Sequence, residues 1–255
     1  AAEFLKVTPS PRVEALGNAF VTETADANAL IQNPAGIYGL ATPEAAVVHN
    51  RYLDGVDESF LAFGLPKSYF KRKSRGSFGM AITYLRVDDF DAYDRFNIPT
   101  GKVSASDLAG TLAYADRLLL THLLNLDGGL SAKVLRSQLH DATARGTAAD
   151  LGLIGTLNAE LPWVTQVRAA FSVQNLGSAI KYGQDAGPLP RVFRLGLSAA
   201  PKSWDKLRIA VQGDKYLAEQ ATCSVGLESR PLSIMQLRLG YHSADVDGSG
   251  LSFGL

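Results

Sequence analysis

The stretch QVRAAFSVQNLG, residues 166–177, alternates apolar and polar or small side chains as far as Gln174. One set of positions is Val167, Ala169, Phe171 and Val173, and the other is Gln166, Arg168, Ala170, Ser172 and Gln174. A period of two is that of a β-strand, in which successive side chains point to opposite faces. The stretch therefore predicts a strand with one apolar face and one largely polar face.

The same alternation recurs on both sides of this stretch, and proline-rich or Asp/Gly/Ser-rich turns separate the repeats. Clear examples are DLGLIGTL, VFRLGLSAA, LRIAVQGD and MQLRLGYH. The pattern predicts an all-β chain with long connections at 86–106 and 177–190. Its strands, about twelve in number, are expected near 43–53, 56–66, 76–86, 106–118, 128–140, 145–158, 164–176, 190–201, 206–215, 220–230, 233–243 and 250–255.

The polar face favours a transmembrane antiparallel β-barrel over a soluble sandwich or barrel. Lysine is nearly absent from the C-terminal strands, and the polar positions hold Arg and Gln diluted with Gly, Ser, Ala and Thr. The segments have about the 9–11 residues that cross a bilayer. The expected lumen network either braces the wall by ion pairs or holds an anionic head group or carboxylate; its members are Arg168, Arg194, Arg208, Asp214, Glu228, Arg238 and His242.

The stretch ADANALIQNPAGIYGL, residues 25–40, does not follow this pattern. It predicts a short helix, capped by Asp26 or Thr24, that ends at Asn33-Pro34-Ala35-Gly36 because proline disfavours α geometry before it. Gly36 allows a positive φ at no steric cost. Irregular backbone at membrane depth needs partners inside the protein. We therefore predict a plug of residues 1–42 inside a barrel of residues 43–255, with Asn33 and Pro34 near the periplasmic mouth.

Composition and motifs favour neither an enzyme nor a metal or cofactor protein. The 255 residues carry a formal net charge of +0, which argues against nucleic-acid binding. Cys223 is the single cysteine, and the four histidines share no metal-ligand spacing. Asp88, Asp89, Asp91 and Asp94 cluster in the expected outer loop, where they are either calcium ligands or, more simply, a solvated acidic loop.

The N-terminal segment and several later stretches carry a family resemblance. It rests on Phe4-Leu5, Arg12, Gly17, Ala19-Phe20 and the NPAG turn, and on FSVQNLGSAIKYG (171–183), LPRVFRLGLSAAP (189–201) and LRLGYHS (237–243). With these features the chain resembles the PorV/PorQ group of bacterial outer-membrane proteins, which is related in fold to the FadL-like barrels. Asn18 stands where the family has a second glycine, and asparagine also accepts a positive φ.

The resemblance implies an outer-membrane barrel of about fourteen strands with a periplasmic N-terminus. We accordingly expect a C-terminal hairpin after Leu255 and a signal peptide removed ahead of Ala1. The implied function is a shuttle or scaffold that binds a secreted substrate or a translocon or complex subunit in contact with outer-membrane lipid. The alternatives are a FadL-like transporter of fatty-acid-like hydrophobic molecules and a purely structural subunit of an outer-membrane assembly.

Overall fold

The computed structural model describes residues 2–52, 55–70, 76–93, 95–158, 161–182, 185–204, 206–232, 234–243 and 250–255. Asp94 of the predicted acidic cluster lies outside these residues. The helical turns are η1 (Glu3–Lys6), α1 (Pro11–Glu14), η2 (Ala27–Ile31), η3 (Pro34–Ile37), η5 (Lys67–Tyr69) and η6 (Lys202–Trp204). No described helix is long and apolar enough to span a membrane.

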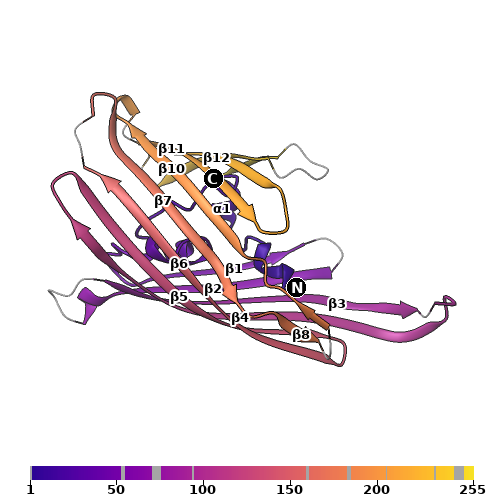
Figure 1. Ribbon diagram of the computed structural model, residues 1–255. Helices are drawn as coiled ribbons and strands as arrows, with labels where there is room; N and C mark the ends of the chain where they lie inside the picture. The colour runs from indigo at the N-terminus through magenta and orange to yellow at the C-terminus, as the bar shows by residue number, and fades with distance from the viewer. Residues whose placement is uncertain are drawn as a thin grey trace.

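Twelve strands form one antiparallel sheet in which each strand pairs with its neighbours along the chain (Figure 1). They are β1 (Glu44–Arg51), β2 (Val56–Pro66), β3 (Ser77–Tyr93), β4 (Pro99–Leu120), β5 (Leu124–Leu139), β6 (Ala142–Leu157), β7 (Val164–Gly177), β10 (Val192–Pro201), β11 (Leu207–Tyr216), β12 (Ala221–Leu232), β13 (Met235–His242) and β14 (Leu251–Gly254). The predicted all-β class and the twelve strands are confirmed.

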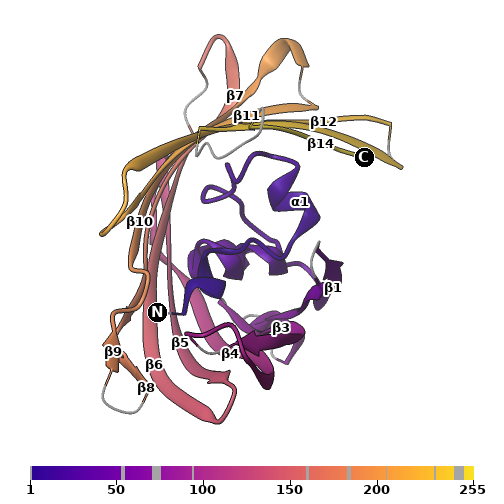
Figure 2. The same cartoon turned by 90° about the vertical axis from the view of Figure 1, so that its right-hand side faces the viewer.

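The sheet curls around the N-terminal segment but is not closed into a barrel (Figure 2). Strands β1 and β14 are its two edges, and no pairing joins them among the described residues. Residues 2–42 lie in the concave side of the sheet rather than in its wall. The first strand begins at Glu44, next to the boundary predicted at 42/43.

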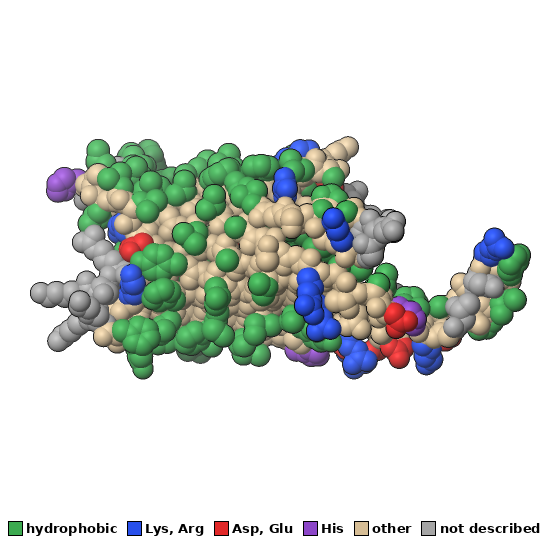
Figure 3. Space-filling view, turned by 60° about the horizontal axis from the view of Figure 1, so that its bottom comes forward, with side chains coloured by type: hydrophobic (Ala, Val, Ile, Leu, Met, Phe, Trp, Pro, Cys, Tyr) green, Lys and Arg blue, Asp and Glu red, His purple; other side chains and the backbone are tan. Residues whose placement is uncertain are grey.

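The two faces of the sheet have the composition that the alternation predicts. Large apolar side chains are exposed on the convex face, among them Leu112 at 69%, Val134 at 64% and Leu195 at 64% (Figure 3). The concave face carries small or polar side chains that are buried, such as Ala62, Ala113 and Gln212. Apolar residues therefore point outward over much of the wall, and the N-terminal segment covers the opposite face.

Two connections differ from the sequence prediction. Strands β3 and β4 continue through most of 86–106, where a long loop was expected, with a register shift between Val87 and Phe90. They form a hairpin that projects beyond the rest of the sheet (Figures 1 and 3). Within 177–190 lies a small hairpin of β8 (Ile180–Tyr182) and β9 (Asp185–Gly187).

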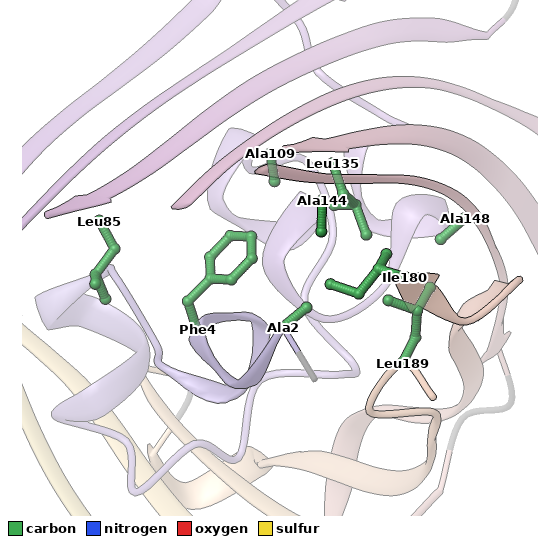
Figure 4. Packing of buried hydrophobic residues seen from close by; sticks show 9 residues of the cluster. All are labelled: Ala2, Phe4, Leu85, Ala109, Leu135, Ala144, Ala148, Ile180 and Leu189. Carbon is green, nitrogen blue, oxygen red and sulfur yellow. The ribbon is translucent and has the colours of Figure 1, made fainter. Parts of the chain in front are cut away.

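The connection that holds β8 and β9 folds back onto the interior of the molecule. Ile180 and Leu189 are buried in a cluster with Ala2 and Phe4 of the N-terminal segment (Figure 4). Four strands, β3 to β6, supply the other members, Leu85, Ala109, Leu135, Ala144 and Ala148. This packing ties the start of the chain to one end of the sheet.

Candidate functional site

The NPAG turn lies on a pair of glycines in the wall. Gly129 of β5 and Gly152 of β6 are register partners on the concave face. A Cβ at Gly129 would overlap with the backbone of Pro34 and Ala35, and one at Gly152 would overlap with the Asn33 side chain. Only residues without a side chain allow the two backbones to approach this closely.

Asn33 connects this turn to both the plug and the wall. It is 1% exposed, and its Oδ1 accepts a hydrogen bond from the Ala35 amide at 3.0 Å, which caps η3. Its Nδ2 donates to the carbonyl oxygen of Val21 at 3.0 Å and to that of Leu153 at 3.4 Å. Pro34 occupies the first turn of η3, where its missing N–H has no cost. A buried amide with three partners fixes the turn against β6.

The expected helix and turn differ from the structure in two details. The helix η2 is a 3₁₀ turn, and a second turn, η3, starts at Pro34 instead of a simple stop. Gly36 does not use the positive φ that glycine allows. Glycine is required there because a Cβ would overlap with the Ala29 side chain and the Glu23 carbonyl oxygen.

Three further positions of this motif follow the sequence analysis. Asp26 caps η2, since its Oδ1 accepts from the Asn28 amide at 2.7 Å. Asn18 takes a positive φ of 67°, directly after Gly17 at 60°. Two consecutive residues are therefore in the left-handed region, and the second of them is the asparagine.

Glu228 is the centre of an ion network on the concave face. Its carboxylate accepts from Arg12 at 3.1 Å, from Arg208 at 2.8 Å and from Arg238 at 2.8 Å. Arg208 and Arg238 are its register partners on β11 and β13, so the sheet places both beside it. Only 11% of the Glu228 side chain is exposed, which makes the pairing energetically important.

The plug supplies the rest of this network. Glu23 pairs with Arg208 at 2.7 Å and with Arg12 at 3.4 Å, and Asp26 also pairs with Arg12. Three arginines thus meet three carboxylates across the plug–wall boundary. The alternation puts Arg208, Glu228 and Arg238 on one face of the sheet. Arg12 and Glu23 were not predicted as their partners, because no local pattern in the sequence locates the plug.

The remaining predicted lumen residues do not join this network. Arg194 pairs with its register partner Asp214 at 3.3 Å, and Gln212 donates to the same carboxylate at 2.8 Å. His242 Nδ1 lies 2.8 Å from the Ser224 hydroxyl. Arg168 forms no ion pair with any part of the chain that the structure describes.

A cavity of about 500 Å³ opens between the plug and one end of the wall. It lies at the end where the β10–β11 and β12–β13 connections are found. Charged side chains dominate its lining, which is formed by Arg12, Glu23, Thr24, Ala25, Arg168, Ala200, Lys206, Leu207, Arg208, Glu228 and Arg230. Part of the predicted polar network therefore borders an accessible space.

The acidic residues predicted for the outer loop lie instead on a strand. Asp88, Asp89 and Asp91 are exposed on β3, and Asp94 is outside the described residues. Nowhere in the described ranges do three or more His, Cys, Asp or Glu side chains gather as a metal site. The calcium alternative, which includes Asp94, stays an untested prediction.

An ion pair also secures the start of the plug at the opposite end of the sheet. Lys6 of η1 pairs with Glu3 and with Glu219, which lies in the β11–β12 connection. Hydrogen bonds from Lys6 to Glu219 and Glu3 raise the pKa of its ammonium group above the ordinary value. This charge is therefore fixed throughout the physiological range.

Comparison with protein-family models and with curated proteins finds no match for this chain.

Proposed function

We propose that this chain is the wall and plug of a bacterial outer-membrane β-barrel that holds a protein partner through the projecting β3–β4 hairpin. The proposed family is the PorV/PorQ group that the sequence resembles, and the N-terminus is proposed to lie on the periplasmic side. It rests on the convex apolar face, the plugged interior and, above all, the hairpin.

The exposed apolar side chains of the convex face support a lipid-facing wall. Monomeric soluble proteins rarely expose large continuous apolar patches, whereas barrels surround themselves with an apolar band. Trp163 and Trp204 are 82% and 70% exposed beside the same end of the sheet, as are Tyr69 and Phe70 at 67% and 71%. Aromatic side chains at one end match the interfacial girdle of such barrels.

The hairpin carries the proposal of a protein partner. Its strands pair as far as Tyr93 and Pro99, well past the ends of neighbouring strands. Phe90, Tyr93 and Phe96 are 48%, 54% and 69% exposed on this extension, next to the acidic side chains of β3. Exposed aromatic residues are typical anchors of protein interfaces.

The interior supports the scaffold over the fatty-acid transporter. Plug residues Phe4 and Leu30 face wall residues Phe60 and Ala81 around a cavity of about 50 Å³. Pockets for small organic ligands occupy roughly 300–1,000 Å³. The space between these plug and wall residues is therefore too small for a hydrophobic ligand of that size.

The test shortens the hairpin without changing the wall. Val87 pairs with Ala105, so replacing residues 88–104 by Asn-Gly leaves a two-residue turn between paired strands. Cross-linking in native outer membranes, followed by mass spectrometry, should identify one partner that the shortened chain no longer binds. Retention of the same partner at the same stoichiometry would refute the proposal.

Point variants separate hairpin contacts from general apolar exposure. We expect Phe90→Ser/Tyr93→Ser to weaken partner binding by about tenfold or more, the usual cost of losing interface anchors. The matched control is Leu139→Ser/Leu217→Ser, since these side chains are 50% and 60% exposed at the same end of the sheet. Equal loss in both variants would show that the hairpin has no specific role.

A further inference from the structure

The cavity of about 500 Å³ between plug and wall contains more positive than negative charge. Arg12, Arg208 and Arg238 are matched by the carboxylates of the ion network described above, namely Glu23, Asp26 and Glu228. That network is neutral as a whole. The net charge of the cavity, and so the charge of the ligand that it attracts, is therefore set by the other charged side chains of its lining.

Those additional side chains are Arg168, Lys206 and Arg230, all of them cations. Within the described residues none of the three forms an ion pair. Lys206 donates to the carbonyl oxygen of Pro231, at 3.4 Å. Three cations without carboxylate partners thus converge from β7, the β10–β11 connection and β12 on one space.

Arg168 shows that this excess is not simply surface charge. It is half-buried on the concave face of β7, where its register partners are Thr156 and Ser198. Neither neighbour carries a charge. Glu23 and Asp127 attract Arg168 electrostatically without forming an ion pair with it, and both carboxylates are already paired with other arginines. A charge removed from water needs a counter-charge or hydrogen-bond acceptors to offset its desolvation. An anion in the cavity would provide both.

We propose that this cavity binds a phosphate monoester, with Arg168, Lys206 and Arg230 around the phosphate group. Guanidinium groups bind phosphate oxygens in a bidentate manner, and three cations match the charge of a dianion better than that of a carboxylate. The volume exceeds what inorganic phosphate needs and falls within the range for small organic ligands. Thr24, Ala25, Ala200 and Leu207 supply smaller, uncharged surface for the organic part.

This cavity does not involve the β3–β4 hairpin, so phosphate binding does not depend on the protein partner proposed for the hairpin. Its ligand chemistry has two possible sources, a soluble phosphate ester or the head group of a phosphatidic-acid-type lipid. The cavity opens at the end where Trp163 and Trp204 are exposed, so both sources can reach it in a membrane.

The test uses the full chain purified in detergent and isothermal titration calorimetry. Inorganic phosphate, glycerol 3-phosphate and dihexanoyl phosphatidic acid are the probes, each at constant ionic strength. We expect saturable binding at one site, with glycerol 3-phosphate bound more tightly than inorganic phosphate. Tighter binding of the lipid than of glycerol 3-phosphate identifies a head-group site, and equal or weaker binding identifies a soluble ester.

Variants assign the binding to the cavity. Arg168→Met should weaken glycerol 3-phosphate binding by about tenfold or more, as expected when a hydrogen bond to a charged group is lost. Arg168→Lys should recover part of the affinity if the charge matters and the guanidinium geometry adds to it. Lys202→Met is the control, because Lys202 is an exposed cation at the same end that does not line the cavity.

Two results would overturn the proposal. One is the absence of saturable binding for every probe with the unmodified chain. The other is an equal loss of glycerol 3-phosphate affinity in Arg168→Met and Lys202→Met. That result would show that the loss reflects general surface charge and not the cavity. Thermal unfolding of each variant in the same detergent verifies that the comparison is made between folded proteins.

Discussion

The plug is held by two unlike interfaces. Its second part, residues 27–40, contacts β2 to β6 through apolar packing: Ala27, Leu30, Ile37 and Leu40 are all buried against alanines and Phe60 of the wall. Its first part, residues 12–26, is also packed, with Val13, Leu16 and Phe20 buried, and in addition contacts β11 and β12 through ion pairs of Arg12 and Glu23. One short segment is therefore held by packing throughout and by ion pairs in its first part.

The difference predicts unequal local stability. Apolar packing against glycine and alanine depends on shape and is insensitive to salt. The stability of residues 12–26 depends in addition on every charged side chain of the network staying paired, and this network borders the open cavity. We expect residues 27–40 to exchange amide hydrogens more slowly than residues 12–26, and high salt to increase this difference.

The largest effect is expected for Glu228→Gln. The substitution leaves Arg12, Arg208 and Arg238 facing each other with one central carboxylate removed. Removal of one partner from a largely buried ion pair costs about 3–5 kcal/mol. Hydrogen exchange should show faster opening of residues 12–26 and little change in residues 27–40.

The control for this variant is Glu219→Gln, which removes one of the two carboxylate partners of Lys6 in a more exposed pair. Exposed pairs contribute about 0–1 kcal/mol, so its effect should be several times smaller. If Glu228→Gln loosened both parts of the plug equally, the two interfaces would form one cooperative unit and the contrast would be lost.

A smaller effect is expected for Gly129→Ala, which acts on the packed interface. The added methyl group would meet the backbone of Pro34 and Ala35, which cannot move aside as a side chain can. Overpacking of this kind costs about 1–3 kcal/mol. Here hydrogen exchange should accelerate in residues 27–40, the reverse of the pattern for Glu228→Gln.

Gly155→Ala on the neighbouring strand is the matched control. A Cβ there lies 3.6 Å from its nearest neighbour, an ordinary contact. Gly155 faces the convex side, so the plug should not respond. Unchanged exchange of residues 27–40 in Gly129→Ala would mean that the turn is not seated on the glycine pair.

The smallest effect is expected for Asn33→Ala, which acts where the two parts of the plug meet. The variant loses the cap of η3 and the bonds to Val21 and Leu153. Loss of a cap alone costs about 1 kcal/mol, and the unpaired carbonyl groups add a similar amount. Exchange should increase on both sides of residue 33, unlike in either previous variant.

Asn158→Ala is the control: it tests whether truncating an exposed asparagine elsewhere also increases hydrogen exchange in the plug. Its side chain makes one long hydrogen bond, at 3.5 Å, to Asn125. We expect no measurable change in plug exchange. A comparable effect from both asparagines would argue against a specific role for the NPAG turn.

Local features were predictable because they depend on neighbours in the sequence. The period of two located strands such as Val164–Gly177 and Leu207–Tyr216 to within two residues. Asp26 as a cap and Asn18 as a left-handed residue follow from the preferences of single side chains. The extension of β3 and β4 was missed because its polar, glycine-containing sequence resembles a loop.

The candidate site was predictable only in part, for the same reason. Arg208, Glu228 and Arg238 fall on one face by alternation, and adjacent antiparallel strands then place them side by side. Arg12 and Glu228 are 216 positions apart, and no periodicity relates them. The cavity with Arg168 likewise exists only once the plug is in place.

The sequence by itself determined an all-β chain, the two faces of its strands and an irregular N-terminal segment, since each depends on spacing and local conformational preference. Only the tertiary structure decided that the sheet stays open between β1 and β14, and where the plug rests. It also decided that glycines such as Gly129 receive the NPAG turn. Those outcomes depend on the curvature of the whole sheet and on contacts between distant residues, which short-range patterns do not encode.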